Sequence, residues 1–290
     1  MVRFALGLFL IVGSAFASDV TVTCYPFGKP LVGGFCTHIP KDSRNLDLVY
    51  YLHGRGNNEK TWNETNYYPE QIRQQWKRTR EDFPTVVSIS FGGVWLLAEK
   101  NASDMSGLWE VFLKQIMPIV EKAVGGVKGK RVLVGESMGG FNSAQLALKT
   151  SLFARAAILC APMSEVSPFA SDAEIQSWIE KSSAWKVYKD SAPDNVKSTV
   201  DGIIQLSKAF YPTQADWDRA NPIILARNAN ADAAPRFYVA AGFYDPYLTY
   251  EGNQAFYKAL LAKGVNVDWR PQWGGHCSMD IPSLARFIVM

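Results

Sequence analysis

Arg131-Val-Leu-Val-Gly-Glu-Ser-Met-Gly-Gly140 is the most informative stretch of this 290-residue chain. Its first four residues predict a buried strand and the residues after Gly139 a helix, with Ser137 on the turn between them. The flanking glycines are needed because a Cβ there would clash with neighbouring backbone. Such a turn presents a hydroxyl at the carboxyl edge of a sheet, and the N–H of Met138 can stabilise an oxyanion. We therefore interpret Ser137 as a nucleophile rather than as part of a purely structural turn.

A serine nucleophile needs a base, and the chain has three histidines, His38, His53 and His276. His276 lies in the loop Trp273-Gly-Gly-His276 after the last predicted strand, where the order serine, acid, histidine places the base. His38 is interpreted as a surface histidine near the N-terminal strands. His53 opens His53-Gly-Arg-Gly56, and we expect it to shape a loop whose backbone N–H groups face the reacting carbonyl.

The third member of such a triad is an acid that orients the histidine. Asp245 follows a predicted strand by a few residues and lies between Ser137 and His276 in the sequence, as the order requires. Asp268 falls inside a strand pattern and Asp280 comes after the histidine, so both are weaker candidates. The alternative role for Asp245 is the capping of a turn.

Strands and helices alternate along the chain. Strands are expected at Leu46–Leu52, Thr85–Phe91, Arg131–Val134, Arg155–Leu159, Arg236–Ala241 and Val265–Trp269. Helices are expected at about Ser106–Val124 with a kink at Pro118, after Gly139, and at Tyr250–Lys263. The alternation predicts an α/β fold with a mostly parallel sheet and helices on both faces. The segments before Pro40 predict an antiparallel pair at the sheet edge.

One segment, about residues 163–235, is too long to be a plain connection between two strands. It contains short helical patterns around Ile175–Trp185 and Val200–Phe210. Long insertions of this kind often carry function. We interpret it as a helical cap over the site.

The N-terminus has the three parts of a secretory signal peptide. Arg3 provides the positive start, Phe4–Val12 the apolar run, and Ala15-Phe-Ala17 the cleavage site. We expect residues 1–17 to be removed, leaving residues 18–290 as the catalytic domain of a secreted or periplasmic protein. No other segment is apolar enough for a membrane span, so no stable membrane anchor is expected.

Composition excludes other classes of protein. Hydrophobic residues make up 48% and charged residues 20% of the chain, as in an ordinary globular protein. The net charge is +3 and the basic residues are scattered, so no nucleic-acid partner is expected.

Four cysteines fit an oxidising compartment and allow three disulfide pairings. We favour Cys24 with Cys36, which lie on neighbouring strand-like segments, and therefore Cys160 with Cys277. The alternative is that Cys160 is a buried thiol.

With these residues in view, the chain resembles the esterase D-like family of the α/β-hydrolase superfamily. This family includes S-formylglutathione hydrolases, feruloyl and acetyl esterases, and mycolyltransferases. The matching stretches are Leu48-Val-Tyr-Tyr-Leu-His-Gly54, Trp109-Glu-Val-Phe-Leu113 to Met117-Pro-Ile-Val-Glu121, and Gly135-Glu-Ser-Met-Gly-Gly-Phe141 with Ala144-Gln-Leu-Ala-Leu-Lys149. Glu136 is a departure, since these relatives often have histidine or leucine there.

The resemblance implies an α/β-hydrolase fold with Ser137, Asp245 and His276 as the triad. It also implies an oxyanion hole around Met138 and either Gly54 or Arg55. The expected function is hydrolysis of a small-molecule or polymer-linked ester through an acyl-enzyme, with no cofactor and no metal. An acyltransferase, a secreted peptidase and a non-catalytic binding module are the alternatives.

Overall fold

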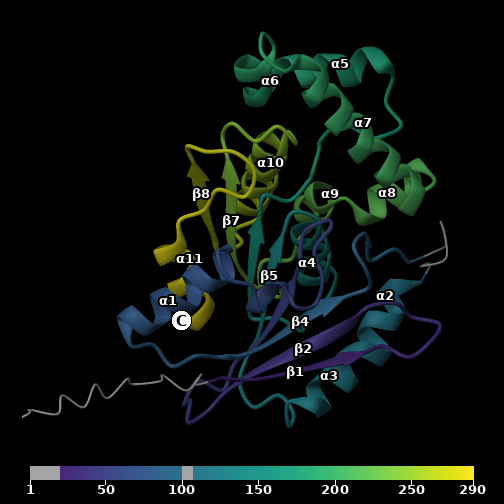
Figure 1. Ribbon diagram of the computed structural model, residues 1–290. Helices are drawn as coiled ribbons and strands as arrows, with labels where there is room; N and C mark the ends of the chain where they lie inside the picture. Colours follow the sequence, from purple (N-terminus) through teal and green to yellow (C-terminus); the bar gives the residue numbers. More distant parts are fainter. Residues whose placement is uncertain (1–19, 100–106) are drawn as a thin grey trace, which may run out of the picture.

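The fold is built on one sheet of eight strands, in the order β1-β2-β4-β3-β5-β6-β7-β8 (Figure 1). A computed structural model describes residues 20–99 and 107–290, so the expected signal peptide lies outside the described residues. The strands are β1 (Val20–Pro26), β2 (Gly34–Pro40), β3 (Leu48–Leu52), β4 (Thr85–Ser90), β5 (Arg131–Glu136), β6 (Arg155–Leu159), β7 (Arg236–Gly242) and β8 (Val267–Gln272). Strands β3 to β8 run parallel, whereas β2 is antiparallel to both β1 and β4. The predicted mostly parallel sheet and its antiparallel edge pair are confirmed.

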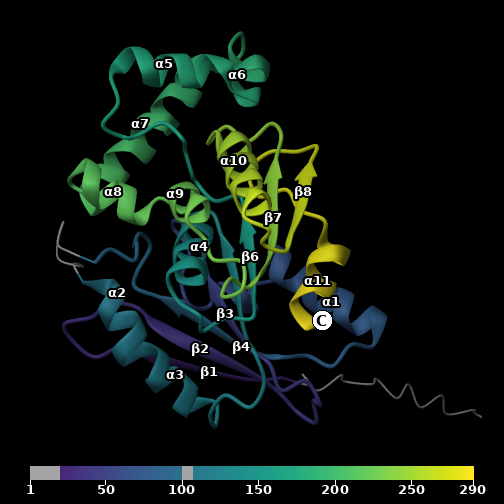
Figure 2. The ribbon, with the colours of Figure 1, turned by 180° about the vertical axis from the view of Figure 1, so that it is seen from behind.

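Helices cover both faces of this sheet (Figures 1 and 2). Successive residues of a strand point to opposite faces, and β3 is buried on both, with Tyr50 packed in one core and Tyr51 in the other. The core that contains Tyr51 is closed by α1 (Tyr68–Thr79) and α11 (Ile281–Val289). The opposite core is closed by α2 (Leu108–Val111), η2 (Phe112–Ile116), α3 (Met117–Ala123), α4 (Met138–Lys149), α9 (Pro222–Arg227) and α10 (Thr249–Ala262).

The helical segment Leu108–Ala123 departs from a regular α-helix just before Pro118. Residues Phe112–Ile116 form a π-helical turn, in which the Met117 N–H donates to the carbonyl of Phe112. Proline has no N–H and cannot complete the regular ladder, so the irregularity predicted at Pro118 takes the form of this turn.

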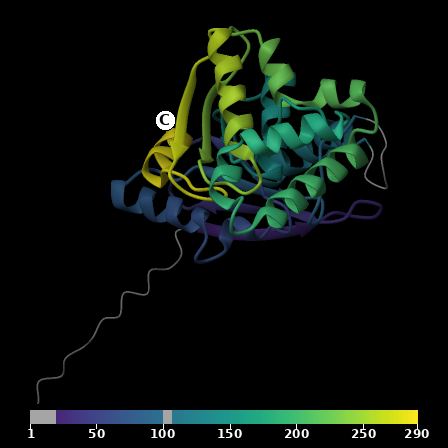
Figure 3. The ribbon, with the colours of Figure 1, turned by 90° about the horizontal axis from the view of Figure 1, so that it is seen from above.

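The chain between β6 and β7 forms the helices of the long insertion. They are α5 (Asp172–Lys181), α6 (Ser183–Tyr188), α7 (Pro193–Phe210), α8 (Gln214–Ala220) and α9. Helices α5 to α7 stand beyond the carboxyl ends of the strands (Figures 1 and 3). They have a small core of their own, formed by Ile179, Ala184, Val196, Val200, Ile204 and Leu248. Neither α8 nor α9 was expected from the sequence, because each is too short to show a helical period.

His38 is buried on β2, so the prediction of a surface histidine is wrong. Only 3% of His38 is exposed, because β1 covers the edge of β2 and α1 covers the face where His38 lies beside Arg73. Burial, with a smaller contribution from the Arg73 charge, lowers the pKa of His38 to about 4. His38 is therefore a neutral core residue far from the predicted nucleophile in the fold.

Candidate active site

Ser137 lies on a strained turn between β5 and α4. Its backbone has φ 48° and ψ −118°, a conformation that a residue with a side chain rarely adopts. A Cβ on Gly135 would overlap the Gly139 carbonyl oxygen, and a Cβ on Gly139 would overlap that of Leu52. The Ser137 N–H donates to the Leu159 carbonyl at 2.8 Å, which ties the turn to β6. The turn has the geometry expected from the sequence, with Ser137 at the carboxyl edge of the sheet.

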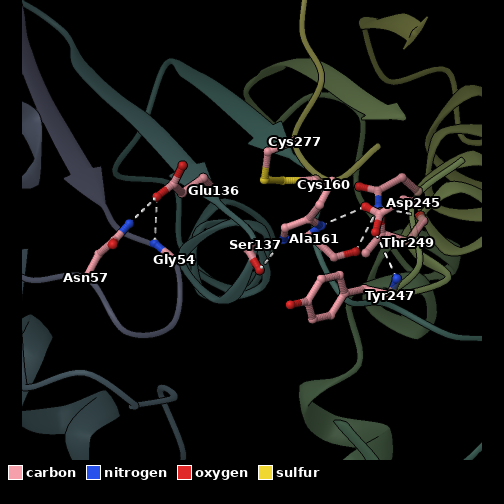
Figure 4. The surroundings of a disulfide bond; sticks show 12 residues. Gly54, Asn57, Glu136, Ser137, Cys160, Ala161, Asp245, Tyr247, Thr249 and Cys277 are labelled. Atoms are coloured by element: carbon pink, nitrogen blue, oxygen red, sulfur yellow. Dashed lines mark hydrogen bonds and ion pairs between the residues drawn. A yellow bond between two sulfur atoms is a disulfide. The ribbon is translucent and has the colours of Figure 1, made fainter. Parts of the chain in front are cut away.

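A chain of hydrogen bonds joins Ser137 to His276 and Asp245. His276 Nε2 is 3.1 Å from Ser137 Oγ, and its Nδ1 is 2.7 Å from Asp245 Oδ2. Asp245 is buried and also accepts from the Tyr247 N–H at 2.9 Å and from the Thr249 hydroxyl (Figure 4). With Nδ1 protonated toward the carboxylate, Nε2 is free to accept the serine proton.

The other two acidic candidates have structural partners. Asp268 forms an ion pair with Arg236 on the neighbouring strand, at 2.9 Å. Asp280 caps α11 by accepting the Ser283 N–H. The geometry therefore brings Asp245, and neither of these two, to the histidine.

A disulfide bond holds the loop that carries His276. Cys160 directly follows β6 and Cys277 directly follows His276, with Cα atoms 5.0 Å apart (Figure 4). The other disulfide, Cys24–Cys36, joins β1 to β2. These are the two pairings favoured from the sequence. Although Cys160, Cys277 and His276 gather closely enough to suggest a metal site, the two sulfurs are bonded to each other and offer no thiolates.

Two backbone N–H groups are unpaired on residues that line the same cleft as Ser137. Among the described residues, those of Met138 and Arg55 donate to no protein acceptor. The Gly54 N–H, by contrast, donates to Glu136 Oε1 at 3.0 Å, so it is not free to bind an oxyanion. Of the two alternatives that the sequence left open for this loop, the geometry favours Arg55.

His53 supports the same loop from below. Its Nδ1 lies 2.7 Å from the Gly54 carbonyl oxygen and its Nε2 lies 3.3 Å from Trp95 Nε1. A neutral ring that donates from Nδ1 and accepts at Nε2 satisfies both contacts, and burial lowers the pKa of His53. The shaping role expected for His53 agrees with these contacts.

Glu136 is the residue at the site that sequence reasoning missed. It is 1% exposed, and its carboxylate accepts from Gly54 and Asn57 (Figure 4). It also accepts from the hydroxyl groups of Tyr51 and Tyr67. Burial raises the pKa of Glu136, while these hydrogen bonds act in the opposite direction. The one signal in the sequence was its departure from the residues usual in the resembling family.

The triad opens into a cleft of about 690 Å³. One wall carries polar and aromatic side chains, including Asn57, Tyr67 and Gln71, while Tyr247 lies beside the His276 ring with centroids 4.3 Å apart. Ile203 and Leu206 of α7 contribute an apolar wall from the insertion. The cleft can hold a neutral molecule with an apolar part.

Comparisons with known proteins identify the family and agree with the fold. The family model described as "Putative esterase" matches residues 34–245. No curated protein matches the chain. One similar solved structure is a ferulic acid esterase, with a TM-score of 0.61 and 17% identity over 93% of this chain and 96% of that one. A second is the fluorophosphonate-binding serine hydrolase FphF of Staphylococcus aureus, with a TM-score of 0.60 and 16% identity over 93% of this chain and 97% of that one. A third is a hyperthermophilic esterase of the archaeon Pyrobaculum calidifontis, with a TM-score of 0.61 and 18% identity over 93% of this chain and 85% of that one. At these identities the structures establish a shared α/β-hydrolase fold.

Proposed function

This chain belongs to the Putative esterase family and is a carboxylic ester hydrolase, and we propose that Ser137, His276 and Asp245 carry out its reaction through an acyl-enzyme. The observation that carries the proposal is the continuous hydrogen-bond chain from the Ser137 hydroxyl to the buried Asp245 carboxylate. The unpaired N–H groups of Arg55 and Met138, two residues of the same cleft, support the second part of the proposal, a place for developing negative charge.

The reaction has two steps on the same residues. In the first, Ser137 Oγ attacks the ester carbonyl while His276 Nε2 takes its proton, and Asp245 stabilises the imidazolium that forms. His276 then protonates the leaving alcohol, and the acyl group stays on Ser137. In the second, His276 deprotonates a water molecule that attacks the acyl-enzyme, and it then returns that proton to Ser137 Oγ as the carboxylic acid leaves. In both steps the oxyanion would accept hydrogen bonds from Arg55 and Met138.

The insertion at about residues 163–235 is proposed to be a cap over this site. Support comes from α7, whose Ile203 and Leu206 line the same cleft as Ser137. An ester of a small molecule or of a polymer would lie between this wall and Tyr67.

Export is proposed on the pattern of residues 1–17. Two disulfide bonds are compatible with an extracellular or periplasmic protein. Among residues 20–99 and 107–290, none of the helices has both the length and the hydropathy of a membrane span.

A fluorophosphonate probe tests the nucleophile. Mass spectrometry should find the phosphonyl group on the peptide that contains Ser137, and hydrolysis of acetyl, butyryl, long-chain and feruloyl esters should identify the acyl group. Ser137→Ala should abolish labelling and lower turnover on the order of 10⁴-fold or more. Ser143→Ala is the matched control, since Ser143 is buried in the same helix and should leave both unchanged. Labelling retained in Ser137→Ala would show that another residue is the nucleophile.

A further inference from the structure

We infer that Glu136 is a positioning residue for the oxyanion hole, holding the loop His53–Asn57 so that the Arg55 N–H faces the reacting carbonyl. The inference rests on the proposed function and deepens it. Glu136 is the residue immediately before Ser137, and it ends β5 on the side where β3 and this loop lie (Figure 4).

One oxygen of Glu136 holds both sides of the loop. Oε1 accepts the Gly54 N–H at 3.0 Å and the Asn57 side-chain amide at 3.0 Å. Arg55 and Gly56 lie between these two donors, so the segment that carries the Arg55 N–H is fixed at both ends to a single atom. Inside the loop, the Asn57 N–H donates to the Gly54 carbonyl at 3.2 Å and the Gly56 N–H to the Gly93 carbonyl at 2.7 Å.

The rest of the carboxylate fixes its own orientation. Oε2 accepts the Tyr67 hydroxyl at 2.6 Å, and Oε1 also receives the Tyr51 hydroxyl at 3.3 Å. Four donors hydrogen-bond to the group and no basic side chain in the described part of the chain forms an ion pair with it, which suits a carboxyl group that accepts at both oxygens. The position of Glu136 is thus determined independently of the loop that it holds.

This arrangement connects the two proposed donors of the oxyanion hole, Met138 and Arg55, through residues adjacent to Ser137. Met138 and Glu136 are the two neighbours of Ser137, one donating its N–H to the oxyanion and the other fixing the donor opposite. An apolar residue at position 136 would leave the buried Gly54 N–H without an acceptor, and the Asn57 amide would keep only its longer contact to the Tyr67 hydroxyl, at 3.4 Å. The loop would then be free to turn toward water, and the Arg55 donor would move with it.

Two substitutions separate positioning from simple structural support. Glu136→Leu removes every acceptor while keeping a similar volume. Glu136→Gln keeps an oxygen for Gly54 and Asn57 and can donate its amide N–H to the Tyr67 hydroxyl. If Glu136→Leu fails to fold, Glu136→Asp withdraws the carboxylate by one methylene and takes its place. Glu121→Gln is the matched control, because Glu121 likewise accepts from a tyrosine (Tyr50, 2.7 Å) and an arginine at the opposite end of the sheet.

The measurements are kcat and KM for an ester, with active sites counted by the end point of fluorophosphonate labelling. An oxyanion donor acts mainly in the transition state, and losing one costs about 10²- to 10³-fold in kcat. For a donor that is displaced rather than lost, we expect Glu136→Leu to lower kcat about 10- to 100-fold, with KM changed less than about threefold. A trifluoromethyl ketone, which mimics the tetrahedral intermediate, should bind more weakly by the same factor, whereas the product carboxylate should not. Glu136→Gln should recover most of the kcat, and Glu121→Gln should keep the wild-type value.

Wild-type enzyme in the same assay keeps the two proposals separate. If wild-type protein is neither labelled at Ser137 nor active on any ester, the proposed function fails. If wild-type protein is active but Glu136→Leu, or Glu136→Asp in its place, retains wild-type kcat per labelled site, Glu136 is only a structural residue and the inference is overturned. A rise in KM with unchanged kcat would overturn it as well.

Discussion

Replacing Cys160 and Cys277 together by alanine should lower both the stability and the turnover of this protein. The disulfide joins the end of β6 to the residue after His276. Cys160 is itself fixed, being buried and donating its N–H to the Ala240 carbonyl at 2.7 Å. The bond therefore holds the glycine-rich histidine loop against the sheet. The second disulfide, Cys24–Cys36, lies in the β1–β2 pair at the edge of the sheet and provides the matched control.

The loop lengths give the expected magnitudes. The Cys160–Cys277 bond closes 117 residues and the Cys24–Cys36 bond closes 12. Chain-entropy arithmetic then gives about 5 kcal/mol for the first bond and about 3 kcal/mol for the second. For a chain of this size, about 2 °C of Tm corresponds to each kcal/mol, so Tm should fall by about 10 °C and about 6 °C respectively.

Activity distinguishes the two disulfides more sharply than stability does. A misplacement of about 1 Å in a reacting group can cost on the order of 10²-fold in rate, so loosening His276 should lower kcat by about 10-fold or more. The Cys24→Ala/Cys36→Ala variant should keep the wild-type kcat. Calorimetry gives Tm, and ester turnover per fluorophosphonate-labelled site gives kcat below the transition. Wild-type kcat in the Cys160→Ala/Cys277→Ala variant would refute the reasoning that this bond positions His276.

Two further predictions follow from single side chains. Asp245→Asn should fold but lose about 10²- to 10⁴-fold in kcat, because the histidine tautomer is no longer fixed. Asp268→Asn should cost only the ion pair with Arg236. The kcat of the two purified variants tests this, and a larger loss of kcat for Asp268→Asn would contradict the assignment of Asp245. The pKa of His38 is near 6.5 in the unfolded chain and about 4 in the folded protein, so between these pH values the unfolded state binds more protons. The free energy of unfolding should therefore decrease by up to about 3 kcal/mol as the pH falls from 6.5 to 4. Urea unfolding at pH 7 and pH 4 should show a smaller decrease in the free energy of unfolding for His38→Gln than for the wild type. Equal decreases in the two proteins would contradict the prediction.

Local patterns in the sequence were sufficient for most of the fold. The strand β6 has its predicted bounds, and the ends of the other strands of the parallel part are displaced by three residues or fewer. These strands are apolar runs bounded by turn residues, which a single sequence reveals well. The prediction for His38 was wrong because its environment is not set by a local pattern. Its burial depends on β1 and α1, and no residue near His38 in the sequence indicates that both will cover it.

The candidate site shows the same difference between residues with a local sequence signal and residues whose role depends on distant partners. Ser137, Asp245 and His276 could be chosen by motif and chain order, and the structure places them within hydrogen-bond distance, while their catalytic roles stay a prediction. Glu136 could not be assigned a role, because its partners are 69 to 85 residues away along the chain. A buried charge can be interpreted only once the donors around it are known.

The small separate core of α5 to α7 gives the two sides of the cleft unequal resistance to opening. The floor, with Ser137 on β5 and α4, belongs to the large cores on both faces of the sheet, and Leu206 and Phe210 near the end of α7 pack with one of them. Ile204 and the buried residues that precede it on α7 pack instead in the small core with Ile179, Ala184 and Leu248. Regions with few buried apolar contacts open locally at a lower free energy than the global transition. The part of α7 that precedes Leu206, together with α5 and α6, can therefore loosen and close again while the nucleophile stays in place, so that the entry of a bulky ester need not disturb the geometry that cleaves it.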